Sequence, residues 1–197
     1  MFSVSLSSPG MIALRHLLIA AVLMVSFTIA GCDGVMDDLI PSGDDKREDV
    51  VGGSMGTQVS QQSPDFSVLD TLGNSRGLYD ELSQPGVTGV VMYFTMWCPV
   101  CESHMNDLRS NVIPNFPTVK FFLVDYVSGS VASSLATQQA FGYTSIDTLV
   151  DSDQAVLDLY NATMGTTVVI NSIGYIVEMN EDYKDGVKLT ETLQALP

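Results

Sequence analysis

Residues 94–101 read Phe-Thr-Met-Trp-Cys-Pro-Val-Cys and join an apolar run, residues 87–94, to a segment that favours a helix. Two thiols at this spacing can close a small disulfide ring. If Cys98 begins the helix, the unpaired backbone N–H groups and the helix dipole stabilise its thiolate. Pro99 suits the first helical position, where its missing N–H would be unpaired in any case. The stretch therefore predicts a dithiol redox centre.

Segments with the patterns of strands and helices alternate around this stretch. Apolar or alternating runs predict strands at residues 66–70, 87–94, 119–125, 148–150, 166–170 and 175–179. Helices are expected at residues 78–82, 99–112, 131–141, 153–160 and 187–196. Pro114 should stop the helix that begins at Pro99, Gly142 should end the next one, and Asp151 or Ser152 should cap the one after. This order predicts an α/β sandwich, with helices on both faces of a central mixed sheet. The two cysteines then lie at the carboxyl end of a strand, where ligand sites concentrate in open α/β sheets.

The composition is that of an acidic globular protein. Of the 197 residues, 46% are hydrophobic, enough for a real core, and the formal net charge is −15. That charge argues against nucleic acid or an anionic membrane surface as a partner, because both attract a basic face. The acidity indicates a self-repelling, solvated surface, with an acidic docking face for a basic partner as the alternative.

The N-terminus has the pattern of a secretion signal. Arg15 and His16 precede the apolar run 17–30, which has signal-peptide length and is short for a membrane span. The run ends Phe-Thr-Ile-Ala-Gly-Cys, which resembles the bacterial lipobox, and this resemblance implies cleavage before Cys32 and lipidation of its thiol. Asp33 resembles the signal that retains such lipoproteins at the inner membrane. A transmembrane helix and a plain secretory signal are the alternatives.

These patterns divide the chain into three parts. We expect a signal peptide at residues 1–31, a lipidated cysteine with a flexible acidic linker at 32–62, and a folded domain at 63–197. The predicted location is the bacterial cell envelope, at the periplasmic face of the inner membrane. A Cys-X-X-Cys in that compartment is oxidised unless something reduces it.

Several motifs resemble one family. Pro64-Asp65-Phe66, the stretch from Tyr93 to Cys101, Asp151-Ser152-Asp153 and residues 166–174 are similar to the membrane-anchored TlpA/ResA-type thiol-disulfide oxidoreductases, within the thiol-specific antioxidant superfamily. The resemblance covers residues 63–195 and is most specific at the Trp-Cys-Pro-X-Cys core. It implies a thioredoxin-like three-layer sandwich.

The resemblance also implies how the site works. Cys98 is the exposed attacking thiol and Cys101 the buried resolving thiol, a division that also follows from their places at the helix tip and one turn inside. Trp97 packs beside the dithiol and shields it, next to Pro99. No cofactor and no metal are needed. The implied partners are client proteins that contain cysteine, a membrane electron donor, and the membrane itself through Cys32.

The sequence departs from the family at three places. Gly165, after Met164, stands where the family has a cis-proline beside the dithiol. His104 replaces a glutamate that many members carry three residues after the second cysteine, and Glu102 lies nearer. Met92 occupies the position of the buried thioredoxin aspartate. Any proton transfer near Cys101 must therefore use His104, Glu102 or water.

Other functions stay open. Cys98, Cys101, His104 and Met164 could form a soft site for Cu(I), as in a metallochaperone. A peroxiredoxin-type thiol peroxidase fits the place of Thr95, three residues before Cys98, although that family's proline seven residues before the cysteine is absent. A static disulfide and a redox-inactive domain that binds a partner protein are further alternatives. The main prediction remains an extracytoplasmic thiol-disulfide oxidoreductase that exchanges disulfides with client proteins.

Overall fold

The computed structural model describes residues 52–180 and 186–196. The predicted signal peptide, Cys32 and most of the predicted linker lie outside these residues. Within them, residues 53–62 bond to the sheet through Ser60, whose N–H donates to the carbonyl of Ile176 at 2.8 Å. The boundary at residue 63 stays a prediction. No helix of the described part has the length and apolarity to cross a membrane.

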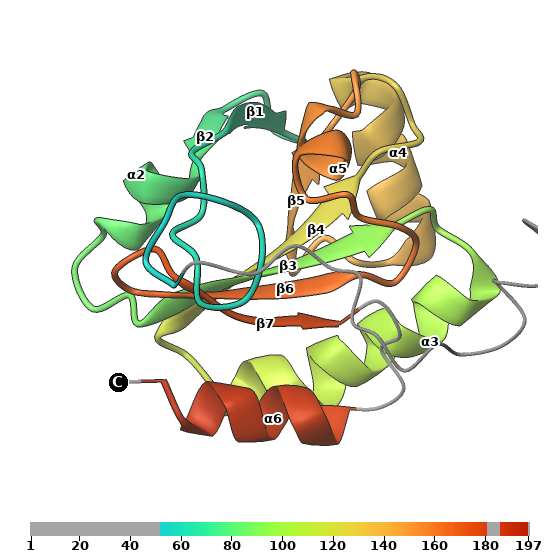
Figure 1. Ribbon diagram of the computed structural model, residues 1–197. Helices are drawn as coiled ribbons and strands as arrows, with labels where there is room; N and C mark the ends of the chain where they lie inside the picture. The colour runs from blue at the N-terminus through green and yellow to red at the C-terminus, as the bar shows by residue number, and fades with distance from the viewer. Residues whose placement is uncertain (1–51, 181–185, 197) are drawn as a thin grey trace, which may run out of the picture. The chain divides into compact units, whose positions relative to one another are not determined.

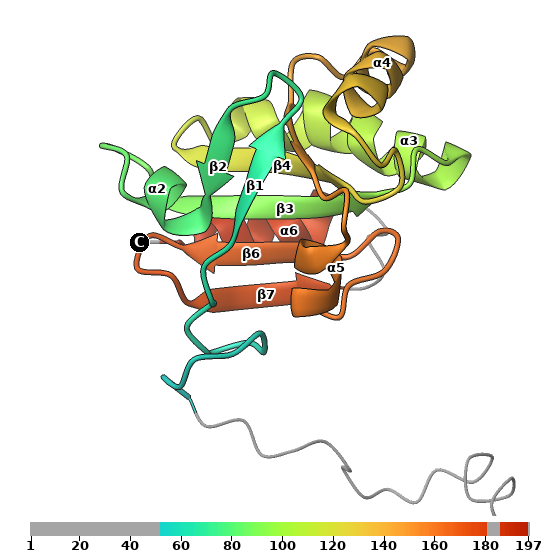
Figure 2. The same cartoon turned by 90° about the horizontal axis from the view of Figure 1, so that it is seen from above.

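The described part contains a seven-stranded mixed sheet in the order β2-β1-β5-β4-β3-β6-β7. Its strands are β1 (Ser67–Asp70), β2 (Ser75–Gly77), β3 (Gly89–Thr95), β4 (Val119–Asp125), β5 (Asp147–Val150), β6 (Thr167–Asn171) and β7 (Ile176–Asn180). β3, β4 and β5 run parallel, and the outer strands pair antiparallel. Figure 2 shows β3, β6 and β7 side by side. The helices lie in the segments where the sequence predicts them, so the predicted sandwich around a central mixed sheet is confirmed.

Helices cover both faces of the sheet. They are α2 (Leu78–Leu82), α3 (Pro99–Asp107), α4 (Val131–Phe141), α5 (Ala155–Leu159) and α6 (Gly186–Gln194). Side chains of β3 alternate between two core clusters: Val91 and Tyr93 pack with α3 and α6, while Met92 and Phe94 pack with α2 and α5. Figure 1 shows α3 and α6 together on one side of the sheet.

β3 is an interior strand between β4 and β6, and all of its residues are buried. It pairs with β4 from Gly89↔Val119 to Thr95↔Asp125 and with β6 on its other side. A strand that is apolar at nearly every position suits this place, because both of its faces are covered. The carboxyl ends of β3 and β4 therefore lie together, and the cysteines follow from one of them.

Two expected helices differ in detail. The helical segment from Pro99 continues as a π-helix (Leu108–Val112) and then as a 3-10 turn (Ile113–Asn115), so Pro114 lies within a helical turn instead of after the last one. α5 begins at Ala155, two residues later than expected, after Gln154 in a left-handed conformation. The N-cap is therefore Gln154 and neither Asp151 nor Ser152, but the Asp151 carboxylate still accepts the N–H groups of Val156 and Leu157 at 3.0 and 2.8 Å.

Candidate functional site

The dithiol lies where β3 ends and α3 begins. Cys98 is the N-cap residue of α3, and Pro99 is its first helical residue, as the sequence predicts. The N–H of Cys101 donates to the Cys98 sulfur at 3.2 Å, so the thiol itself caps the helix. The two Sγ atoms lie 2.7 Å apart, and both cysteines are free thiols.

The two thiols differ in exposure and in acidity. Cys98 is half-buried, whereas Cys101 is completely buried. Burial acts to raise the pKa of Cys98, but hydrogen bonds from the Cys101 side chain and from nearby backbone N–H groups outweigh it and lower the pKa. Burial raises the pKa of Cys101, and the interaction with Cys98 adds to this rise. The arrangement thus makes Cys98 the more acidic and more accessible of the pair, which is the condition for an attacking thiolate.

Trp97 connects the strand to the helix in an unusual conformation. Its φ is +58°, in the left-handed region that bulky residues rarely adopt. The side chain is 7% exposed and packs on Phe141 with ring centroids 5.6 Å apart. Within the described part of the chain, the buried indole Nε1 has no hydrogen-bond partner. Trp97 is thus held in a strained turn in the same core cluster as Cys101, and its role as a shield of the dithiol stays a prediction.

Thr95 takes part in the site in a way the sequence analysis missed. It is fully buried, and its Oγ1 accepts the N–H of Trp97 at 3.0 Å. Its hydroxyl also hydrogen-bonds the Cys101 side chain, and this bond lowers the pKa of Cys101 against the larger effect of burial. The signal was present in the sequence, because a hydroxyl at the last position of an apolar strand needs a partner.

His104 and Glu102, the predicted proton carriers, have other observed contacts. The Nδ1 atom of His104 lies 2.9 Å from the hydroxyl of Tyr93, and the two rings make an edge contact. The side chain of Glu102 is exposed, and its backbone carbonyl accepts the hydroxyl of Tyr143 at 3.0 Å. The role of either residue in proton transfer stays a prediction.

Gly165 and Met164 lie in the loop before β6. The N–H of Gly165 donates to the carbonyl of Phe94 at 2.9 Å, which ties the loop to the end of β3. The φ of Gly165 is +86°, a value that suits glycine, and the described residues contain no cis peptide bond. Met164 is half-buried and packs on the same core cluster as Cys98. Both residues thus lie on the dithiol side of the fold.

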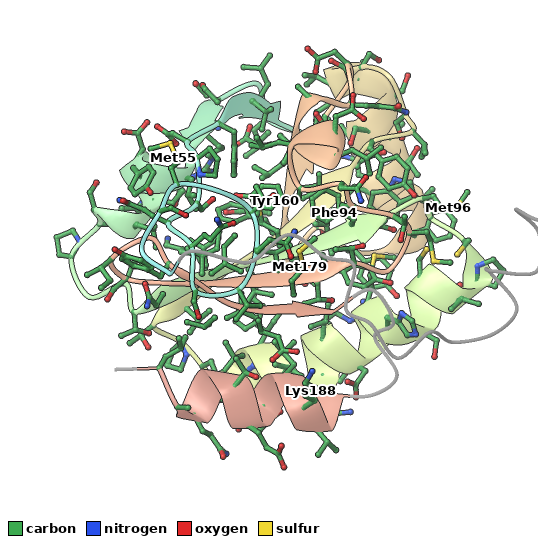
Figure 3. The ribbon with its side chains drawn as sticks, viewed as in Figure 1. Met55, Phe94, Met96, Tyr160, Met179 and Lys188 are labelled. Carbon is green, nitrogen blue, oxygen red and sulfur yellow. The ribbon has the colours of Figure 1, made fainter. Side chains whose placement is uncertain are left out.

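Exposed apolar side chains lie just after the ends of β3 and β4 and in the first turn of α3. Met96, Val100 and Val127 are 45%, 53% and 45% exposed. Figure 3 shows Met96 at the carboxyl end of β3, where the ribbon turns into α3. Large apolar side chains exposed around a reactive group are suited to contact another protein. We call Met96, Val100 and Val127 the apolar rim.

The described residues gather no group of three or more His, Cys, Asp or Glu side chains that could hold a metal ion. A copper site would therefore depend on the two thiols, with Met164 as a soft side chain in the same core cluster.

A family match extends over most of the described domain and includes the dithiol. The AhpC/TSA family matches residues 59–179. A comparison with curated proteins finds no match.

Solved structures show that the fold is thioredoxin-like. A secreted disulfide oxidoreductase of Mycobacterium tuberculosis homologous to E. coli DsbE aligns with a TM-score of 0.53 at 20% identity, over 66% of this chain and 96% of that one. Peroxidoxin BcpB from the same organism gives 0.56 at 20% identity, over 73% and 99%. The exposed lipoprotein thioredoxin Etrx1 of Streptococcus pneumoniae gives 0.52 at 20% identity, over 68% and 100%.

Proposed function

Because the chain belongs to the AhpC/TSA family, we propose that it is a thiol-disulfide oxidoreductase that exchanges disulfides with client proteins. The Cys98 thiolate attacks a client disulfide, and one client sulfur leaves as a thiolate. Cys101 then attacks Cys98 in the mixed disulfide, releases the client as a thiol and leaves a Cys98–Cys101 disulfide. A separate electron donor reduces that disulfide for the next cycle.

The observation that carries this proposal is the inequality of the two thiols. Cys98 is accessible and has a lowered pKa, while Cys101 is buried, has a raised pKa and lies with its sulfur 2.7 Å from that of Cys98. A static bridge would not need this difference, and a loop closed over so few residues stabilises little. The apolar rim supports a protein as the substrate, because it offers exposed apolar surface at the ends of β3 and β4 and in the first turn of α3 that a client can cover.

The location and partners form the second part of the proposal. We infer that Cys32 carries a lipid and tethers the domain at the periplasmic face of the inner membrane, where a membrane protein supplies the electrons. The lipobox-like sequence supports this, and one structural neighbour is an exposed lipoprotein. Globomycin treatment or Cys32→Ser should leave an unprocessed or unlipidated protein, and mass spectrometry of the N-terminal peptide reads the difference. An unmodified mature N-terminus in the untreated protein would contradict the anchor.

A redox titration tests the activity. The full-length protein in detergent is equilibrated with glutathione or dithiothreitol couples, and free thiols are read by alkylation, first without metal and then with Cu(I). A reversible two-electron couple that copper leaves unchanged supports the oxidoreductase. A potential near about −270 mV points to a reductant and one near about −120 mV to an oxidant.

The titration, together with an assay of hydrogen peroxide consumption, separates the alternatives. A stable one-to-one copper complex that removes both thiols would replace exchange with copper binding. Consumption of hydrogen peroxide faster than of a disulfide would favour the peroxidase. Thiols that never titrate reversibly would indicate a static bridge or a redox-inactive binding domain.

A further inference from the structure

Tyr126 follows the end of β4, which adjoins the end of β3 that leads to the dithiol. β3 and β4 are parallel and their last pair is Thr95↔Asp125, so Tyr126 and Met96 are the next residues at adjoining strand ends. Neighbouring strands lie about 4.8 Å apart. Cys98 follows Met96 by two residues, which brings the tyrosine to the same edge of the sheet as the attacking sulfur.

The backbone on both sides of Tyr126 is fixed. Its carbonyl accepts the side-chain amide of Gln154 at 3.1 Å. The buried carboxylate of Asp125 accepts the N–H groups of Val127 and Ser128 at 3.1 and 3.0 Å, and also the hydroxyl of Ser134 at 2.6 Å. The ring itself is half-buried against the core cluster that contains Phe94. The phenol is therefore a positioned group on a rigid element and not a mobile surface side chain.

The hydroxyl of Tyr126 interacts electrostatically with both sulfurs, and no hydrogen bond joins it to either. Burial raises its pKa, and negative charge on Cys101 and Cys98 raises it further, so the phenol keeps its proton at neutral pH. Within residues 52–180 and 186–196 the hydroxyl has no hydrogen-bond partner, and it is not one of the buried side-chain atoms that lack a partner. It is thus an unused donor in contact with solvent, at the strand ends that lead to the two sulfurs, each of which already has its own partners.

A donor so placed is suited to a third sulfur, that of the client. We propose that the Tyr126 O–H donates a hydrogen bond to the leaving sulfur of the client disulfide while Cys98 attacks. In this step the Cys98 sulfur bonds to the near client sulfur, the client S–S bond breaks, and its electron pair stays on the distant sulfur. Tyr126 keeps its proton and stabilises that new thiolate, which later takes a proton from water. This inference rests on the proposed exchange activity and assigns a catalytic residue to it.

The leaving group supplies the test. A thiolate that is already stable, such as the thionitrobenzoate released from Ellman's disulfide, needs little help, whereas the alkyl thiolate released from hydroxyethyl disulfide carries a concentrated charge. Iodoacetamide also reacts with the Cys98 thiolate but releases no thiolate. These three reagents separate an effect on the leaving sulfur from an effect on Cys98.

The experiment compares full-length wild type, Y126F and the control Y175F, all reduced and in detergent. Tyr175 is also half-buried but lies in the β6–β7 turn, at the end of the sheet away from the dithiol. We expect Y126F to slow the reaction with hydroxyethyl disulfide about tenfold and to leave the other two rates within about twofold, because only the alkyl thiolate depends on the hydrogen bond. Y175F should match the wild type with all three reagents.

Two results would overturn the inference. Equal losses with all three reagents would mean that Tyr126 acts on the Cys98 thiolate or on the fold, and thermal unfolding followed by circular dichroism tells these apart. Unchanged rates in Y126F would remove the tyrosine from the reaction. If wild-type Cys98 reacts with iodoacetamide but attacks neither disulfide, the proposed exchange activity itself fails, and the role of Tyr126 fails with it.

Discussion

Two regions of the sheet bury ionisable groups. In one region the groups have opposite charges and pair with each other, and in the other they are two thiols that are buried to different extents. At the β1–β2 edge, Arg76 Nε donates to the Asp70 carboxylate at 2.9 Å, and a second guanidinium nitrogen donates to Glu81 at 2.8 Å. Asp70 also accepts the backbone N–H groups of Leu72 and Asn74. Burial opposes the charge on Asp70, but the hydrogen bonds from Asn74 and Arg76 outweigh burial and lower its pKa. The guanidinium of Arg76 thus pairs with both carboxylates, and we call this cluster of Asp70, Arg76 and Glu81 the ion-pair corner.

At the end of β3 two like groups share one site and are buried unequally. The pKa of Cys98 falls and that of Cys101 rises, and each sulfur is a cause of the other's shift. In the first region each carboxylate is paired with Arg76, and this pairing stabilises the fold. In the second region the two thiols are buried to different extents, and this difference makes Cys98 the reactive one. We therefore expect substitutions in the first region to change stability and substitutions in the second to change reaction rates.

The largest expected effect comes from removing the attacking sulfur. Cys98→Ser should lower disulfide exchange by on the order of 10³-fold or more, because the nucleophile is lost, while the thermal midpoint of the reduced protein stays close to that of the wild type. The matched variant Cys101→Ser should still attack and then accumulate a mixed disulfide, visible by mass spectrometry. Exchange that survives in Cys98→Ser would contradict the proposed mechanism.

The ion-pair corner should show the reverse behaviour. Arg76→Met leaves Asp70 and Glu81 buried without their cation and should lower the free energy of unfolding by about 3 kcal/mol. Urea unfolding measures this loss, and the alkylation rate of Cys98 in the folded protein should not change. A lower alkylation rate of Cys98 in this variant would show that the two regions are coupled, and it would contradict the contrast drawn between them.

Thr95 should affect the second half of the reaction. Thr95→Val removes the hydroxyl that bonds Cys101, so the pKa of Cys101 should rise further and resolution of the mixed disulfide should slow about tenfold. Thr88→Val, on the exposed pair with Thr118 at the start of the sheet, is the control. The lifetime of the mixed disulfide after rapid mixing and acid quench gives the result. An unchanged lifetime would leave Thr95 as a purely structural partner of Trp97.

The smallest effects are expected in the dependence of stability on pH. The two regions should contribute to stability in different pH ranges. The folded-state pKa of Asp70 is lowered, so its stabilisation is present above pH 3.8 and is lost as the pH falls through the lower folded value. Cys98 has the same sign in the alkaline range: its contribution to the reduced protein is present above its unfolded pKa and is lost as the pH falls through the lowered folded pKa. The raised pKa of Cys101 acts in the opposite sense and is expected to offset it.

Urea unfolding of the reduced protein across both pH ranges measures these contributions. Asp70→Asn should reduce the loss of unfolding free energy that occurs as the pH falls in the acid range, and it should leave the pH dependence in the alkaline range unchanged. An alkaline slope that depends on Asp70 would contradict the separation of the two windows.

Local sequence signals were enough for much of the fold. The range of β4 and that of α4, with its end at Gly142, were predicted as observed, because an apolar run and a helix-ending glycine need little tertiary information. β2 was missed, since three polar or small residues have no strand pattern of their own and become a strand only by pairing with β1. The π-turn after α3 was missed as well, and it contacts α6, a tertiary neighbour that the local pattern does not reveal.

The sequence by itself determined where the two thiols stand, which of them begins the helix, and that the strand before them is central. Those features depend on neighbours in the chain: a spacing of two residues, a proline at the first helical position and a continuous apolar run. Only the tertiary structure decided which other side chains reach the sulfurs. Thr95 interacts with Cys101 because the strand end turns back at Trp97, and Tyr126 comes to the same edge of the sheet because β4 pairs with β3 in a register that no local pattern encodes.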